Sequence, residues 1–265
     1  MTFIFDRETA LIALDDGLFT IEASDVYRNP TGMAFAGWVA AIAARAVEMH
    51  PECRGPLVSQ QIIYMTGVGP GEVTLSVSLL RAGASTQFWR VELSQNGALT
   101  NAADIVTSTR RPTDIDYQVE MPTTKSPVDS ISLPSVNPMA PKWVSHYDQR
   151  IAKGMPFAIN ESPEAIVWIK EADGRPVDRV SLFSILDTPM PRTFFVTEQF
   201  RPGSTVSMAT YIYASEEDLA EAGSDFLLLR VTGATVRNSA TDGRAEIWSK
   251  SGIMLATSSQ IGFFR

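Results

Sequence analysis

Alternating apolar and polar residues flank a tight glycine turn at two places in the chain. Residues 89–110 (WRVELSQNGALTNAADIVTSTR) and 243–265 (GRAEIWSKSGIMLATSSQIGFFR) each contain two such runs, which turn at Gly97 and Gly252. A period of two predicts half-buried strands, and Asn-Gly or Ser-Gly between two runs predicts a β-hairpin. The two glycines lie 155 residues apart, so the pattern indicates an internal duplication.

Each copy is predicted to have a second strand pair upstream of its hairpin. In the first copy, Gln60–Met65 and Val73–Arg81 flank a glycine-rich turn. In the second copy, Thr193–Phe200 and Ser204–Ala214 flank Arg201-Pro202-Gly203. Proline and glycine between β-patterned runs are typical of turns, so four antiparallel strands are expected in each copy.

A helix is predicted before the strands of each copy. Residues Phe35–Met49 (FAGWVAAIAARAVEM) are rich in alanine, the residue with the highest helix propensity. Residues Arg179–Leu186 follow Asp178, a residue type favoured at the N-cap, and Pro189 ends the segment. The alanines allow a sheet to wrap closely around the first helix. The alternative, an alanine-rich surface helix, fits poorly because Trp38 and its apolar neighbours leave little polar surface.

These patterns predict an α+β protein made of two tandem, helix-wrapped antiparallel sheets. The expected organisation is an N-terminal unit at residues 1–111, a linker at 112–142 and a C-terminal unit at 143–265. The linker is assigned by its content of proline, serine and threonine, a composition that does not form a core.

Composition narrows the possible functions. The chain has 265 residues and a net charge of −8, and no basic run exceeds Arg110-Arg111, so nucleic acid is not an expected partner. A single cysteine (Cys53) and two histidines (His50 and His146) provide neither an internal disulfide nor a metal-binding pattern, so no metal is predicted. The N-terminus does not have the pattern of a signal peptide, and no segment is long enough to span a membrane. We therefore expect a cytoplasmic protein.

Four segments resemble the acyl-CoA thioesterase II family, and together they extend over nearly the whole chain except the linker. They are Gly32–Ala46 (GMAFAGWVAAIAARA), Arg179–Asp187 (RVSLFSILD), Arg201–Tyr213 (RPGSTVSMATYIY) and Ser251–Arg265 (SGIMLATSSQIGFFR). The resemblance implies a double-hotdog fold, in which the two units form a pseudo-dimer. It also implies a hydrolase of lipid metabolism that splits an acyl-CoA into free acid and CoA. CoA is then part of the substrate, and no separate cofactor is expected.

The family's catalytic residues are an Asp, a Thr and a Gln. By position they correspond to Asp187 at the end of the second helix, Thr205 after the Pro-Gly turn, and Gln260 in the closing strand. Ser207, two positions beyond Thr205 and expected on the same strand face, is the alternative to Thr205. The glycine pair usual at the start of the family's first helix is Ala36-Gly37 here. These two residues are the candidates for binding the substrate and its oxyanion through backbone amides.

Residue chemistry supports the same assignment but leaves alternatives open. A carboxyl group at the end of an apolar helix has a raised pKa if it is buried, which suits a general base. The amide of Gln260 can both donate and accept a hydrogen bond and can therefore orient a water molecule. The alternatives are that Asp187 faces solvent at the helix end, that Gln260 points outward, and that Thr205 is an ordinary strand residue.

The two copies differ at these positions. With Gly97 aligned on Gly252, Gln260 corresponds to Ile105, and Asp187 corresponds to the alanines of residues 40–44. The first copy is apolar where the second has its candidate catalytic groups. One active site per chain is therefore expected.

Other functions remain possible on the same fold. A hotdog hydratase would need an Asp-His pair, but Asp25–Phe35 contains no histidine. A non-catalytic protein that binds acyl-CoA or lipid is the other alternative, because a fold does not fix a function. No Gly-x-Ser-x-Gly motif is present, which argues against an α/β-hydrolase. Unpaired sheet edges and faces favour a homodimer or a higher homo-oligomer.

Overall fold

The first half of the chain wraps a curved antiparallel sheet around one long helix. The computed structural model describes residues 2–133 and 140–265. The elements of the first half are, in chain order, α1 (Ile4–Glu8), β1 (Ile12–Asp15), β2 (Leu18–Ala23), α2 (Ala36–Glu48), β3 (Leu57–Tyr64), β4 (Gly71–Ala82), β5 (Thr86–Gln95) and β6 (Ala98–Ser108). Within the sheet the strand order is β1-β2-β4-β5-β6-β3, which places β3 at the edge that faces the second half.

The second half repeats this plan with a shorter helix. Its elements are η2 (Lys142–His146), β8 (Tyr147–Lys153), β9 (Ala165–Glu171), α3 (Arg179–Ile185), η3 (Arg192–Phe195), β10 (Gly203–Ile212), α4 (Glu216–Ala222), β11 (Leu227–Thr232), β12 (Val236–Arg237), β13 (Ala240–Trp248) and β14 (Met254–Phe264). The strand order β10-β14-β13-β11-β9-β8 mirrors the order in the first half.

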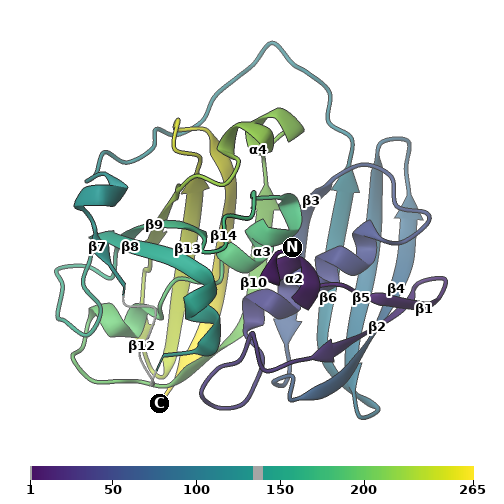
Figure 1. The fold of residues 1–265 in the computed structure, drawn as a ribbon, viewed down its shortest axis with the longest axis horizontal. Coiled ribbons are helices and arrows are strands. Elements are labelled where there is room, and N and C mark those ends of the chain that lie inside the picture. Colours follow the sequence, from purple (N-terminus) through teal and green to yellow (C-terminus); the bar gives the residue numbers. More distant parts are fainter. Residues whose placement is uncertain (1, 134–139) are drawn as a thin grey trace.

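Strands β3 and β10 join the two halves into one sheet. They pair antiparallel, with Ile63 opposite Ser207 and Gln60 opposite Thr210. The described strands thereby form a single 14-stranded sheet, and helices α2 and α3 lie next to each other near its centre (Figure 1). This is the pseudo-dimeric arrangement expected from the duplication.

Small residues let the two central helices pack closely. The alanines of α2 from Ala40 to Ala46 are fully buried. A Cβ atom on Gly37 would lie 2.7 Å from the carbonyl oxygen of Ser184 in α3, so only glycine fits there without displacement. The alanine-rich segment is therefore a core helix. The predicted helices Phe35–Met49 and Arg179–Leu186 are confirmed to within one residue or two at each end.

One predicted strand is wrong. Thr193–Phe200 contains the 3₁₀ turn η3 and a loop, and the missing fourth strand is β11. Pro189 and Pro191 redirect the chain after α3, and Phe195 turns inward to pack on the core side of the sheet. An apolar run of this length has the same sequence pattern whether it forms a strand or a packed loop.

The described part of the predicted linker lies against the second half. Gln118 donates to the Gly252 carbonyl oxygen (2.6 Å) and accepts from the Met254 amide (2.9 Å). Further along, the linker forms η1 (Pro127–Asp129) and the short strand β7 (Ile131–Ser132), which pairs with β8. Residues 134–139 of the linker lie outside the described residues, and the exact domain boundaries stay a prediction.

Candidate active site

Asp187 lies where helix α3 ends. Asp178 and Ser181 form a capping box at the start of the helix, and Leu186 is its C-cap. Asp187 follows directly, beside the start of α2, and its exposed fraction is only 8%. The alternative in which Asp187 faces solvent is therefore wrong.

The surroundings of Asp187 favour a carboxyl group that can exchange a proton near neutral pH. Burial raises the pKa of Asp187 to about 7, and the backbone amide of Gly37 offsets part of this rise. Removing a carboxylate from water disfavours its charged form, whereas an N–H donor favours it. A carboxyl group with this pKa can act as a general base at physiological pH.

The first turn of α2 brings backbone amides to the same place. The Gly37 amide stabilises the Asp187 carboxylate. The Ala36 amide belongs to the first helical residue, whose N–H has no acceptor within the helix. Among the described residues the Ala36 amide has no acceptor, so of the two amides proposed to hold an oxyanion it is the available one, while Gly37 is directed to the acid.

Thr205 and Gln260 are joined by a hydrogen bond. The Thr205 hydroxyl donates to Gln260 Oε1 at 3.2 Å. Gln260 lies opposite Met208 across β10 and β14, and Met208 is buried in the core. Directly paired residues project to the same face of a sheet, so Gln260 and Thr205 lie on the helix side. The outward-pointing alternative for Gln260 is wrong.

Ser207 lies on the opposite face from Thr205, which corrects the expectation that they share one. The pairing of β10 with β14 shifts between Thr205 and Ser207, because a bulge there interrupts the alternation. Ser207 lines a hollow of about 560 Å³ on the outer face, together with Arg90, Asp104 and Arg244. It is therefore not an alternative to Thr205 at the Asp187 side.

Tyr64 lies near both Asp187 and the first turn of α2, and no sequence pattern indicated this role. Its hydroxyl donates to the Ala36 carbonyl oxygen at 3.1 Å, and the charge of Asp187 contributes to its raised pKa. Tyr64 follows Ile63, which pairs with Ser207, so it adjoins the bulge after Thr205. Tyr64 thus lies near Asp187 and, across β3 and β10, near the strand segment that contains Thr205. No hydrogen bond among the described residues joins Asp187 to Thr205 or Gln260.

A second buried polar cluster lies behind α3. Burial raises the pKa of Glu171 to about 8, although Arg175 opposes the rise, and Glu171 Oε1 has no hydrogen-bond partner among the described residues. The nearby Tyr147 hydroxyl bonds to Ser184 Oγ at 2.9 Å. Glu171 is the last residue of β9. The only feature of the sequence that could have indicated a buried acid here is its position at the end of an apolar run.

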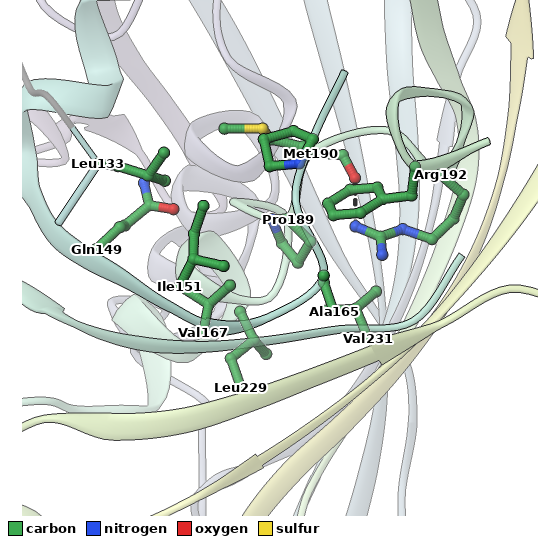
Figure 2. A pocket seen from close by; sticks show the side chains of 13 residues that line it. Leu133, Gln149, Ile151, Ala165, Val167, Pro189, Met190, Arg192, Leu229 and Val231 are labelled. Carbon is green, nitrogen blue, oxygen red and sulfur yellow. Dashed lines mark hydrogen bonds between the residues drawn. The ribbon is translucent and has the colours of Figure 1, made fainter. Parts of the chain in front are cut away.

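A small apolar cavity lies beyond Asp187, on the helix side of β8, β9 and β11. Its volume is about 20 Å³, and Ile151, Val167 and Leu229 form one side of it (Figure 2). Pro189 and Met190 line it from the segment that follows the acid. The apolar residues after α3 therefore help to enclose a small space.

The described residues were compared with the requirements of a membrane-spanning helix and of a metal site. None of the helices in residues 2–133 and 140–265 is long and apolar enough to cross a membrane. In the same ranges, no three His, Cys, Asp or Glu side chains gather in an arrangement that could hold a metal ion.

Two helix-wrapped sheets joined through β3 and β10 define a double hotdog. The acyl-CoA thioesterase family matches in two parts, its N-terminal domain over residues 25–109 and its C-terminal domain over residues 119–264. The chain belongs to this family.

Solved structures with the same fold align over nearly the full length of the chain. A hot dog-fold protein from Alicyclobacillus acidocaldarius has a TM-score of 0.94 and 25% identity, covering 100% of this chain and 99% of its own. A putative thioesterase II from Thermobifida fusca has a TM-score of 0.85 at 16% identity, covering 99% and 98%. An acyl-CoA thioesterase II from Mycobacterium marinum has a TM-score of 0.78 at 17% identity, covering 98% of each chain. No curated protein sequence matches significantly.

Proposed function

We propose that the protein hydrolyses the thioester bond of an acyl-CoA, giving free acid and CoA, and that Asp187, Thr205 and Gln260 position the attacking water. The observation that carries the proposal is the buried Asp187, with a pKa of about 7, next to the start of α2. Family membership supports the substrate class.

Each group has a chemical task in this proposal. The Asp187 carboxylate accepts a proton from water as the water oxygen attacks the thioester carbonyl carbon. Thr205 and Gln260, already bonded to each other, orient that water through the remaining hydrogen-bonding capacity of the glutamine amide. The Ala36 amide, at the positive end of α2, stabilises the oxyanion of the tetrahedral intermediate. The intermediate collapses, the carbon–sulfur bond breaks, and the CoA sulfur leaves with the proton from Asp187.

Turnover of an acyl-CoA panel, followed with a thiol reagent that detects released CoA, tests this function. We expect the wild-type protein to release CoA. We expect Asp187→Asn and Gln260→Ala to lower kcat/KM by about a hundredfold or more, because each removes a group that acts on the water. Asp225→Asn is the control, since that aspartate is exposed and bonds at the surface to Lys250 and to the Phe226 amide.

The other hotdog functions predict different results in the same assay. A non-catalytic binding protein would bind acyl-CoA with no release of CoA from the wild type. A hydratase would consume enoyl-CoA without freeing a thiol. Full activity in both Asp187→Asn and Gln260→Ala would refute the site assignment even if the protein is a thioesterase.

A further inference from the structure

The two central helices differ in length, and the shorter one leaves part of its sheet to be covered by loops. Helix α2 has 13 residues and α3 has 7. Two prolines follow Asp187 closely and keep the chain from continuing as a helix. The helix-side face of β8, β9 and β11 is therefore covered beyond Asp187 by η3 and its flanking loops.

The cavity under this shortened helix begins close to the acid. Pro189 lines it, and two residues of chain span at most about 7 Å. Asp187 itself does not line the cavity, so an acyl group whose carbonyl carbon is held at the acid would enter it past Pro189. The strand residues that line it are apolar, such as Ile151 and Leu229, except for Gln149 of β8 (Figure 2).

Arg192 forms a fixed and charged wall of this cavity. Its exposed fraction is 3%, and its guanidinium reaches into the space from the side opposite Ile151 (Figure 2). It donates to the carbonyl oxygens of Pro163 (2.7 Å) and Met190 (2.5 Å), and it lies 4.3 Å from the centre of the Phe195 ring. Among the described residues it forms no ion pair. An acyl chain long enough to reach this guanidinium would place its methyl end against the charge. This contact is unfavourable because a methyl group cannot pair with the charge or accept its hydrogen bonds.

We propose that the site accepts short acyl groups, of the size of acetyl to butyryl, and that Met190 and Arg192 are the specificity-determining residues that exclude longer chains. The inference rests on the proposed thioesterase function and adds its substrate class. A cavity of about 20 Å³ holds roughly one or two water-sized groups. A chain of more than a few carbons would exceed this volume.

The acyl chain-length profile of kcat/KM tests this proposal. For the wild type on acetyl-, butyryl-, hexanoyl- and octanoyl-CoA, we expect a fall of about tenfold or more from butyryl to octanoyl, because each methylene that does not fit is costly. Met190→Ala enlarges the cavity, and Arg192→Met removes the charge at similar length. Each is expected to raise the octanoyl-to-butyryl ratio by about tenfold. Met190→Phe, which fills the cavity, is expected to shift the preference towards acetyl.

Met49→Ala is the matched control, because Met49 is an exposed methionine at the far end of α2. Its profile should equal that of the wild type. Circular dichroism and the melting temperature identify variants that fail to fold. Met190→Phe is expected to shift the preference towards shorter chains, opposite to Met190→Ala and Arg192→Met, so the test does not depend on any single variant. Equal turnover of octanoyl- and butyryl-CoA by the wild type, or an unchanged profile in folded Met190 variants, would overturn the inference alone. No turnover of any acyl-CoA would instead overturn the proposed function and the inference with it.

Discussion

The two halves of the molecule have the same architecture but use their central helices differently. Counted from the N-caps Phe35 and Asp178, the position of Asp187 corresponds to Ala44, which is fully buried. Helix α2 continues past that position and fills its sheet, whereas α3 stops before it. The first half uses the position for packing, and the second half places an ionisable group there.

The closing strands show the same division. In the hairpin alignment Gln260 of β14 corresponds to Ile105 of β6, and Ile105 is part of the core. A polar side chain on the helix side costs stability unless it is hydrogen-bonded, and Gln260 has Thr205 as its partner. The duplication therefore supplies the fold twice, and a few polar residues in place of apolar ones distinguish the second half.

The pH dependence of turnover gives the largest expected effect. If Asp187 is the only base, kcat/KM falls about tenfold for each pH unit below its pKa of about 7, because the protonated acid cannot accept a proton. A single working site per chain predicts one ionisation in this limb. The profile measured from pH 5 to 9 checks it. Asp187→Asn should flatten the limb, and two ionisations in the acid limb would contradict the division between the halves.

The buried Glu171 gives a second difference, in stability. The pKa of this carboxyl is raised from 4.5 to about 8 in the folded protein, so ionisation destabilises the fold. The free energy of unfolding should therefore decline between these values as pH rises, by up to about 1.4 kcal/mol per pH unit, a few kcal/mol in total. Below the unfolded pKa the penalty is absent.

Urea unfolding of Glu171→Gln at several pH values measures this effect. The glutamine cannot ionise, so the variant should lose this part of the pH dependence and be the more stable protein at pH 8 to 9. Glu22→Gln is the control, because Glu22 lies in β2, the strand of the first half that corresponds to β9, and is exposed. Identical pH profiles for Glu171→Gln and the wild type would rule out a buried, protonated Glu171.

Local sequence signals predicted much of this fold. The hairpins at 89–110 and 243–265 and the alanine-rich helix are confirmed, because turn chemistry and composition act within a few residues. Strand β11 was missed because Leu227, Leu228 and Leu229 are all buried. The linker residue Met121 packs near Leu228 on the outer side, so the alternation expected of an exposed sheet face is lost.

The site was predictable only where a residue's role depends on its own strand or helix. Asp187 and Gln260 could be chosen from their element and from the family resemblance. The pKa of Asp187 depends partly on a hydrogen bond from the Gly37 amide, some 150 residues earlier in the chain. The bulge that separates Thr205 from Ser207, and the reach of Tyr64 to Ala36, depend on pairing between strands and halves. A single sequence does not contain these long-range contacts explicitly.

Gly37→Ala tests the contact between the two halves. The added methyl would lie 2.7 Å from Ser184 O and 2.6 Å from the Phe35 ring, which itself stacks on Trp143 at 4.1 Å. Overpacking of this kind costs about 1–3 kcal/mol, which exceeds the gain of about 0.5–1 kcal/mol from better helix propensity. We expect a net loss of about 1 kcal/mol in urea unfolding, with lower turnover because Asp187 shifts.

Gly69→Ala is the matched control for this substitution. A Cβ there meets only the Gln95 side chain, at 3.5 Å. Its stability should lie within about 0.5 kcal/mol of the wild type. If Gly37→Ala proved as stable and as active as the control, close packing of α2 on α3 would not be what holds the acid in place.

Tyr64→Phe gives the smallest expected effect, and it tests whether the first half contributes to the working site beyond packing. The substitution keeps the ring and removes the hydroxyl that donates to the Ala36 carbonyl oxygen. One hydrogen bond contributes about 0.5–1.5 kcal/mol to stability. Since this bond fixes the first turn of α2 beside Asp187, turnover should fall severalfold, mainly in kcat, while the KM for acyl-CoA changes little.

Tyr213→Phe is the control for the loss of a tyrosine hydroxyl, because that residue is exposed and its hydroxyl bonds to Thr257 at 3.0 Å. Steady-state kinetics of both variants on the same acyl-CoA measure the difference. A fall in kcat that is confined to Tyr64→Phe would make the first half an active contributor, because a purely structural hydroxyl would lower stability without changing kcat. Equal kinetics in the two variants would indicate that the first half contributes only packing to the site.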